Sequence, residues 1–529
     1  MSLFHQGNAS VARADKSSAT RAIIVTGDDK QAAFWRSRLG ETSENRPGET
    51  FPRVLAERGS KGNFLGTLQA YDQVFAGREL VSSGLTRLEQ IVMLVGAGTR
   101  LSPFTQALGN MKSAFPLPDA DSSPAGLSVG EAAIRSTAPW IQCLRQGGFE
   151  GLIVRWGDEV LIPSSELVAA PDQYADVDAV RFAWRTDPTI SLANQKEWLL
   201  VDSRTGFVIR DLPRQPMSSL LRELSASAYS DTATYVNLGS LAASHRLLRA
   251  ACESFQGELN DSSSAVNWDP YFWMALQCAD IDSWEAIGRA EARFGGTGFA
   301  SLGSAVPRFF SAVQSMKRRL QQELGRELRV AVMDFGEPYW LDAGNHLSLR
   351  NTFGDVFAPN EQGRVVRAFL GLPESLSEGE SFVRDSKIAP GVRVHGSVII
   401  GSEIRDPGSS IEGAIVIGSR LGRLRVNSGG VVLCSVSDDL EVQGPHGIAF
   451  RIFGKSKVAG TESAATLLMG NRSTTMTYDD KLGTIGDGTY SEAVLGNSMS
   501  FRDASQAMGL VDPLLLDRLW STARSVSQT

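Results

Sequence analysis

The stretch QIVMLVGAGTRLSPFT, residues 90–105, decides the fold of this chain. Ile91 to Val95 form a continuous apolar run, which is typical of a strand buried on both faces of a parallel sheet. Gly96 follows at once, so the chain turns where the strand ends. Gly96 and Gly98 remove side chains from that turn, which lets backbone N–H groups converge on one space. The stretch therefore predicts an α/β fold with an anion-binding loop at a strand end.

Strand and helix patterns alternate on both sides of this loop. Short apolar runs that predict buried strands are followed by longer stretches that predict helices. We expect strands in residues 21–29 and 151–162, and helices in residues 30–39 and 130–149. The alternation predicts a Rossmann-like α/β domain whose sheet is mixed and mainly parallel.

The pattern changes in the last third of the chain. Ile388, Val394 and Ile400 lie six residues apart, and Ile411 and Ile417 resume the same step. An aliphatic residue at every sixth position is typical of a left-handed parallel β-helix, in which each hexapeptide forms one side of a triangular coil. An irregular β-sandwich is the alternative interpretation.

These patterns divide the chain into four segments. The first is polar and rich in Ser and Ala, so we expect it to be flexible, and it lacks the apolar stretch of a secretory signal. The expected segments are a flexible N-terminus (1–20), an α/β domain (21–375), a β-helix domain (376–505), and a C-terminal helix and tail (506–529).

Composition and charge exclude several classes of function. The 529 residues are 42% hydrophobic and 21% charged, an ordinary globular balance. A net charge of −7 gives no general attraction for nucleic acid or an anionic membrane. No stretch approaches the roughly 18 apolar residues of a membrane helix. The four cysteines form no CxxC pair, so we expect reduced thiols, no structural zinc and a cytoplasmic location.

Two cations accompany the glycine-containing loop. Arg100 offers a planar, permanently charged fork for phosphate oxygens, and Lys112 adds a compact positive charge. The spacing fits neither a Walker loop nor a Rossmann dinucleotide fingerprint. We therefore expect a phosphate-binding segment of a different kind, made of Gly96, Ala97, Gly98 and Thr99.

With these residues in place, GAGTRLSPFT followed by a lysine resembles the sugar-1-phosphate nucleotidyltransferase (nucleotide-sugar pyrophosphorylase) family. Members carry G-x-G-T-R-L-x-P-x-T and then Pro-Lys, whereas here Met111 precedes Lys112. The resemblance implies an enzyme that transfers a nucleotidyl group from a nucleoside triphosphate to a sugar 1-phosphate and releases pyrophosphate. It also implies a Mg²⁺ requirement, catalytic roles for Arg100 and Lys112, and nucleotide binding by the glycine loop.

Other segments follow the order of that family. Asp158 and Asp342 resemble its two metal ligands, and they end the stretches GLIVRWGD and YWLD. Asn237 and Gly239 resemble its sugar-binding N-x-G segment. Each of these residues has a structural alternative, because Asp, Asn and Gly are also common in plain turns.

Two features set this chain apart from common bacterial members. The family's Glu-Lys-Pro has its best counterpart in Arg214-Gln215-Pro216, so Arg214 would replace a lysine that approaches the sugar phosphate. A glycine-containing segment with Gly66 and Thr67, expected to form a turn that binds the base, precedes the loop. That order, and the stretch ALGNMKSAFPLP, resemble the L-fucose-1-phosphate guanylyltransferase branch, which favours GTP and a fucose-like sugar.

Two other functions stay open at this stage. The departures at Met111 and Gln215 also suit a non-catalytic subunit that binds a nucleotide-sugar. An acyltransferase site in the predicted β-helix would have His395 as its only candidate histidine. The β-helix could also serve as the contact surface of a homo-oligomer.

Overall fold

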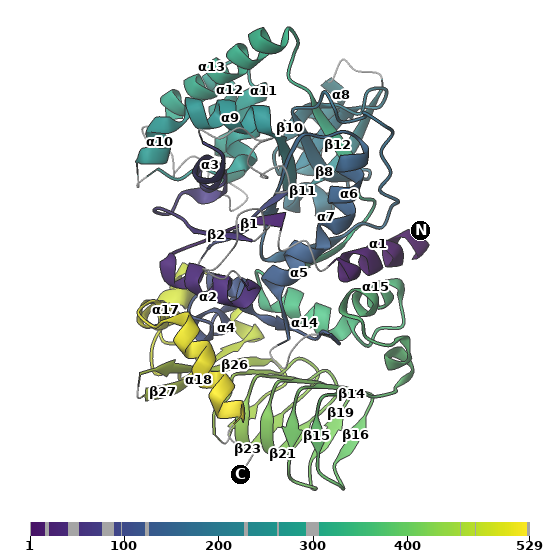
Figure 1. Ribbon diagram of the computed structural model, residues 1–529, viewed down its shortest axis with the longest axis vertical. Coiled ribbons are helices and arrows are strands. Elements are labelled where there is room, and N and C mark those ends of the chain that lie inside the picture. The colour runs from purple at the N-terminus through teal and green to yellow at the C-terminus, as the bar shows by residue number, and fades with distance from the viewer. Residues whose placement is uncertain are drawn as a thin grey trace.

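A computed structural model describes residues 2–15, 21–40, 52–76, 89–96, 98–121, 126–226, 231–261, 264–292, 306–454, 456–470 and 472–525. An α/β unit occupies the upper part of Figure 1, and a stack of short strands occupies the lower part. Helices α14 and α15 lie between the two parts, and α17 and α18 flank the strand stack. The site described below is built from residues of the α/β unit.

The helices of the described residues cover both units. In chain order they span Ser2–Ala14 (α1), Asp29–Leu39 (α2), Gly62–Phe75 (α3), Phe104–Ala107 (α4), Val129–Ser136 (α5), Ala138–Gln146 (α6), Ile190–Gln195 (α7), Met217–Ala226 (α8), His245–Ser254 (α9), Gln256–Asn260 (α10), Trp273–Gln277 (α11), Ile281–Ala292 (α12), Val306–Leu324 (α13), His346–Asp355 (α14), Glu361–Leu370 (α15), Asp487–Ser491 (α16), Phe501–Gly509 (α17) and Pro513–Ser525 (α18). The last of these lies in the stretch expected to be helical.

The central sheet has the strand order β10-β9-β11-β6-β3-β1-β2, with β8 beside β11 and β12 beside β8. Its strands β2, β1, β3 and β6 are parallel, whereas β11 runs antiparallel to β6, β8 and β9. The α/β class is confirmed, and the sheet contains both parallel and antiparallel pairs, because the long strand β11 runs against its neighbours β6, β8 and β9. The strands span Ala22–Thr26 (β1), Arg53–Ala56 (β2), Gln90–Leu94 (β3), Gly151–Trp156 (β6), Ala179–Arg185 (β8), Trp198–Asp202 (β9), Val208–Leu212 (β10), Thr232–Ser244 (β11) and Val330–Asp334 (β12).

The middle strands β1 and β3 are buried on both faces, as their continuous apolar runs predicted. Ile23 and Ile91 pack in a core with α3, α9, α11 and α13. Ile24 and Val92 point the other way, into a core with α2 and α5. Burying both faces fixes these strands firmly, so the loop that leaves β3 starts from a rigid support.

One predicted helix is divided in two. Residues 130–149 form α5 and α6, with the break at Thr137. Pro139 lies in the first turn of α6, where a backbone N–H has no partner within the helix and its absence is tolerated. Because Pro139 has no N–H to donate, the hydrogen-bond ladder of α5 cannot continue through it.

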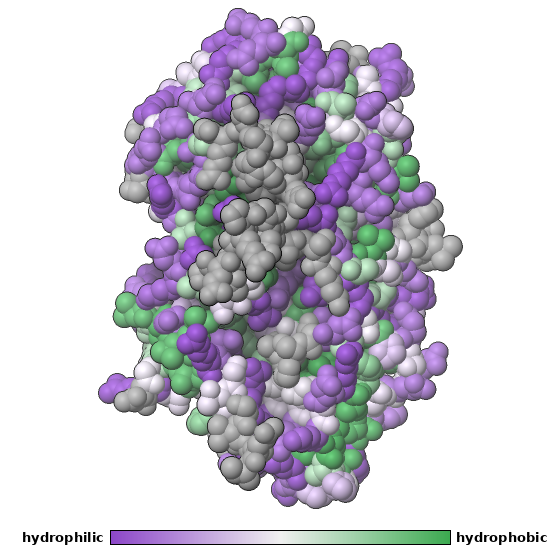
Figure 2. Space-filling view, in the orientation of Figure 1, coloured by the Kyte–Doolittle hydropathy of each residue, from purple (hydrophilic) through white to green (hydrophobic). Residues whose placement is uncertain are grey.

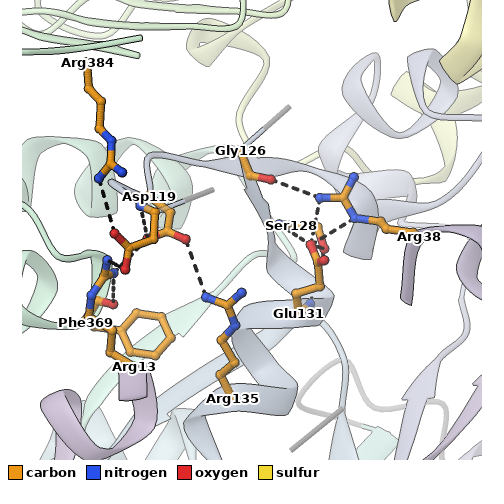
Figure 3. Close-up of polar contacts among 10 residues, drawn as sticks. Arg13, Arg38, Asp119, Gly126, Ser128, Glu131, Arg135, Phe369 and Arg384 are labelled. Carbon is orange, nitrogen blue, oxygen red and sulfur yellow. Dashed lines mark hydrogen bonds and ion pairs between the residues drawn. The ribbon is translucent and has the colours of Figure 1, made fainter. Parts of the chain in front are cut away.

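The N-terminal segment is helical where the structure describes it. The polar composition predicts flexibility over residues 1–20, yet α1 docks against α15 and buries Ala9 and Ala12. Arg13 donates from Nη1 to Oδ1 of the buried Asp119 at 2.7 Å (Figure 3). These tertiary contacts order a segment whose polar composition alone does not predict a helix.

The C-terminal strands form parallel ladders. One ladder has the order β14-β17-β20-β22-β24-β26, and β27 turns back antiparallel to β26. Buried serines stack at one corner: Ser419 N donates to Ser402 Oγ at 3.1 Å, and Ser435 N donates to Ser419 Oγ at 3.0 Å. These partners are 17 and 16 residues apart, which sets the length of one coil.

The strands of this ladder span Phe382–Arg384 (β14), Val398–Ile400 (β17), Ile415–Ile417 (β20), Val431–Leu433 (β22), Ile448–Phe450 (β24), Glu462–Met469 (β26) and Arg472–Asp479 (β27). Those of the second sheet span Lys387–Ile388 (β15), Arg393–His395 (β16), Glu403–Ile404 (β18), Ser410–Glu412 (β19), Arg420–Val426 (β21), Val436–Val442 (β23) and Ser456–Val458 (β25).

The short coil changes which side chains face the interior of the stack. Ile411 lies in the inner core together with Ile399 and Val416. Ile400 and Ile417, which continue the same six-residue spacing, instead face outward. A coil of 16 or 17 residues is shorter than three hexapeptides. The six-residue spacing of aliphatic residues therefore falls out of register with the coils.

The outward face of the ladder packs on the α/β unit, so the two parts share one core. Phe450 of β24 contacts Phe104 and Phe115 of the segment after the glycine loop, with ring centroids 5.7 and 5.1 Å apart. Among the described residues, no helix is both long and apolar enough to cross a membrane. Hydrophilic residues dominate the face shown in Figure 2, with hydrophobic ones in separate patches.

Candidate active site

The glycine loop leaves β3 in a backbone conformation that favours glycine. Gly96 has φ +101° and Gly98 has φ +57°, while Ala97 lies outside the described residues. Thr99 begins a short 3-10 turn directly after the loop. A Cβ on Gly98 would lie only 2.8 Å from Cβ of Lys112. The glycine is therefore needed for the Lys112 segment to lie against the loop.

Lys112 reaches a carboxylate across the end of the sheet. Its Nζ lies 2.5 Å from Oδ2 of Asp158, in the turn between β6 and β7 (Glu159–Ile162). A Cβ on Gly96 would lie 3.6 Å from the same Nζ. The lysine amine therefore sits between the glycine loop and Asp158.

The second predicted carboxylate joins the same group. β13 (Tyr339–Asp342) pairs antiparallel with β7, and Ala343 N donates to the backbone oxygen of Asp158 at 2.8 Å. Oδ1 of Asp342 accepts from Gly344 N at 2.7 Å. A Cβ on Gly344 would lie 3.0 Å from Nη2 of Arg100, so the guanidinium reaches this segment. The structure thus brings together Arg100, Lys112, Asp158 and Asp342.

Sequence reasoning missed a third carboxyl at this point. Glu159 follows Asp158 directly and pairs with Asp342 across the two strands. Burial raises the pKa of Glu159 to about 8, and the charges of Asp158 and Asp342 add to the rise. The signal was available, because Glu159 adjoins the Gly-Asp pair at the end of the predicted strand.

A cavity of about 310 Å³ opens beside this group. Asn237 lies where the register of β11 shifts, and its Nδ2 donates to Oε2 of Glu197 at 3.1 Å. Its Oδ1 accepts from the N–H of Gly239, which has φ +81° and lies against the indole of Trp156. The lining includes the predicted Asn237, Gly239 and Arg214, together with Asn63, Trp156, Glu159, Gln195, Lys196, Glu197, Leu238 and Trp340.

Lys196 is a second residue that sequence reasoning missed. Its Nζ lies 3.4 Å from the ring centroid of Trp340, a cation–π contact. Burial lowers the pKa of Lys196, while the charges of Glu159 and Asp342 act against this shift. No motif surrounds Lys196, so only the folded chain shows that it shares a cavity with Arg214.

Gly66 and Thr67 lie apart from this cavity's lining. The expected turn over residues 58–67 is replaced from Gly62 onward by α3, and both residues lie inside that helix. Thr67 Oγ1 donates to Asn63 O at 2.6 Å and accepts from Trp268 Nε1 at 3.4 Å. The hydroxyl is thus used within the protein core, which does not fit the predicted contact of Thr67 with a base.

Asp158 and Asp342 have a donor set that fits Mg²⁺, which prefers one or two carboxylates beside phosphates and water. Within the described residues, no hydrogen bond engages Asp158 Oδ1 or Asp342 Oδ2. The same part of the chain contains no group of three or more His, Cys, Asp or Glu side chains arranged for a metal. A cation here would complete its shell with substrate oxygens.

Comparisons with known proteins add no family assignment. Neither a scan against models of known protein families nor a search of curated protein sequences finds a match to this chain.

Proposed function

We propose that this chain is a sugar-1-phosphate nucleotidyltransferase, with a Rossmann-like catalytic domain and a left-handed β-helix. One observation carries the proposal. Arg100, Lys112, Asp158 and Asp342, which come from four separate segments, converge at one edge of the sheet. The cavity with Asn237 adjoins them.

The reaction needs alignment and charge stabilisation more than proton transfer. A phosphate oxygen of the sugar 1-phosphate attacks the α-phosphorus of the triphosphate, and the bond to the β-phosphate oxygen breaks as pyrophosphate leaves. The nucleophile is already an anion, so no general base is required. Repulsion between two anions is the main obstacle, and fixed cations reduce it.

The residues of the edge suit this task. Lys112, now paired with Asp158, would turn to the triphosphate when it binds, and Arg100 would stabilise charge on the leaving pyrophosphate. Asp158 and Asp342 would hold Mg²⁺, which when bound neutralises the phosphate charge. The glycine loop would offer backbone N–H groups to the same phosphates.

The sugar phosphate would occupy the cavity. Lys196 and Arg214 both line it, so two cationic side chains border the cavity where the family's Glu-Lys-Pro supplies one lysine. Asn237, held by Glu197, would bind sugar hydroxyls. We therefore propose that the Arg214-Gln215-Pro216 departure leaves phosphate binding intact.

The decisive experiment measures pyrophosphate release with Mg²⁺. GTP, UTP, ATP, CTP and dTTP are tested against L-fucose, glucose and mannose 1-phosphates, and GTP with L-fucose 1-phosphate is the favoured pair. Release that depends on both substrates supports the proposal. If folded protein releases none but is stabilised against heat by a nucleotide-sugar, the non-catalytic binding subunit replaces it.

A further inference from the structure

The glycine loop is held from outside by a distant histidine. Nε2 of His346, the first residue of α14, lies 2.9 Å from the backbone oxygen of Ser102. A carbonyl oxygen only accepts, so Nε2 carries the proton and donates. Ser102 follows Arg100 by two residues and closes the turn on Thr99, because its N–H and Oγ both bond to the Thr99 oxygen. The hydrogen bond from His346 therefore holds the turn that carries Arg100.

Aromatic rings fix the orientation of His346. The ring of Tyr478, on β27, stacks on it with centroids 4.1 Å apart and planes 7° apart. Phe104 meets the imidazole edge-on at 5.0 Å, and Tyr478 Oη donates to Gly483 O at 2.7 Å. His346 is 3% exposed, and burial lowers its pKa to about 3. The ring thus stays neutral and keeps its single donor at ordinary pH.

The same short segment carries Asp342, Gly344 and His346. Asp342 stands with Asp158, Gly344 lies against the guanidinium of Arg100, and His346 binds the peptide just beyond Arg100. Asn345 caps α14 by accepting from Ser348 N at 2.9 Å, which stiffens the connection. A movement of His346 would therefore change the distance between Arg100 and the carboxylates.

We propose that His346 is a positioning residue for nucleotidyl transfer, and that it acts through Ser102 to place Arg100 toward the phosphates. Because Tyr478 stacks on His346, the C-terminal strand β27 also helps to hold this turn in place. This inference rests on the proposed function. It assigns the strand stack a task in catalysis, as the support of the loop.

Two variants separate the hydrogen bond from the packing. His346→Gln keeps an N–H donor and loses the ring, whereas His346→Phe keeps the ring stack and loses the donor. Positioning predicts that His346→Phe lowers kcat at least tenfold with a smaller change in KM, and that His346→Gln retains kcat within about threefold. A purely structural role predicts the reverse order, and wild-type kcat in folded His346→Phe overturns the proposal.

Hydrogen exchange gives a readout that does not need activity. Amides of residues 98–108 should exchange faster in His346→Phe than in wild type or His346→Gln, while those of β3 stay unchanged. If His346→Phe does not fold, Tyr478→Leu, which removes the stacked ring and its hydrogen bond to Gly483 O, should loosen the same amides. Unchanged exchange overturns the positioning role, whereas a wild-type protein that releases no pyrophosphate overturns only the proposed function.

Discussion

Lys112 and Asp158 face each other across the end of the central sheet, with Nζ 2.5 Å from Oδ2, although 46 residues separate them in the chain. A bound triphosphate would compete with Asp158 for the lysine. The carboxylate that gives up its lysine would then be able to bind Mg²⁺.

This exchange predicts a large loss on neutralising either carboxylate. Asp158→Asn and Asp342→Asn should each lower kcat for pyrophosphate release by about 100-fold or more, because fixed charges provide most of the stabilisation. The far-UV spectrum and unfolding midpoint should stay near wild type. Asp438→Asn, at a carboxylate whose side chain is 96% exposed, is the control. Normal turnover in folded Asp158→Asn would remove Asp158 from the site.

Gly98→Ala should displace Lys112. The new Cβ would meet Cβ of Lys112 at 2.8 Å, so we expect the KM for the triphosphate to rise about tenfold. Gly206→Ala is a matched control: Gly206 has φ +72°, which imposes the same backbone strain, but its Cβ would meet nothing within 4 Å. Equal KM values for the triphosphate in the two variants would show that Gly98 is needed only for its backbone conformation.

Lys196→Met should weaken binding of the sugar phosphate only. Losing a charge-assisted contact of about 1.5–3 kcal/mol predicts a 10- to 100-fold higher KM for the sugar 1-phosphate. The KM for the triphosphate should change little. Lys387→Met, at an exposed lysine of β15, provides the comparison in the same steady-state assay. A rise in the KM for the triphosphate instead would mean that Lys196 binds the triphosphate and not the sugar 1-phosphate.

Acid should destabilise the fold through its buried histidines. Burial lowers the pKa of His346 to about 3 and that of His245 to about 4, from 6.5 in the unfolded chain. The folded state then binds fewer protons, so stability is full above about pH 7 and falls as the pH drops through 6.5. In urea titrations at pH 7.5 and 4.5, His346→Gln should reduce this loss by about 3 kcal/mol. His395→Gln, at an exposed histidine, should leave the loss unchanged.

The docking of α1 depends on Arg13. Arg13→Met removes a partner of the buried Asp119, which keeps a 3.5 Å contact with Arg135 (Figure 3). We expect a loss of about 2 kcal/mol in the free energy of unfolding. Arg204→Met, at an arginine whose side chain is 75% exposed, should cost less than about 0.5 kcal/mol. Similar losses in both variants would mean that the ion pair contributes little.

Sequence patterns succeeded where the cause is local. The run from Ile91 to Val95 predicted β3 to within one residue, because an apolar run bounded by glycine has few other uses. The sequence indicated a position near a strand end for both Asp158, which lies in the turn after β6, and Asp342, which ends β13.

The patterns failed where distant segments decide the outcome. Lys196 enters the cavity only because β9 and β11 pair, and no local motif records that pairing. The sequence suggested that Thr67 could contact a base, but its hydroxyl accepts a hydrogen bond from Trp268 in the core beside α3. Ile400 and Ile417 face outward because they pack in the core that the ladder shares with the α/β unit. A six-residue spacing of aliphatic residues does not indicate which side of the ladder each one faces.

The contact between Ser102 and the His346–Tyr478 stack also orders events during synthesis. Several hundred residues separate Ser102 from Tyr478, and at about 5–20 residues per second a ribosome needs tens of seconds to join them. Until then the glycine loop lacks its contact with His346 and Tyr478, and Phe104 and Phe115 lack their contact with Phe450. A chain halted in that interval would expose these aromatic side chains to solvent.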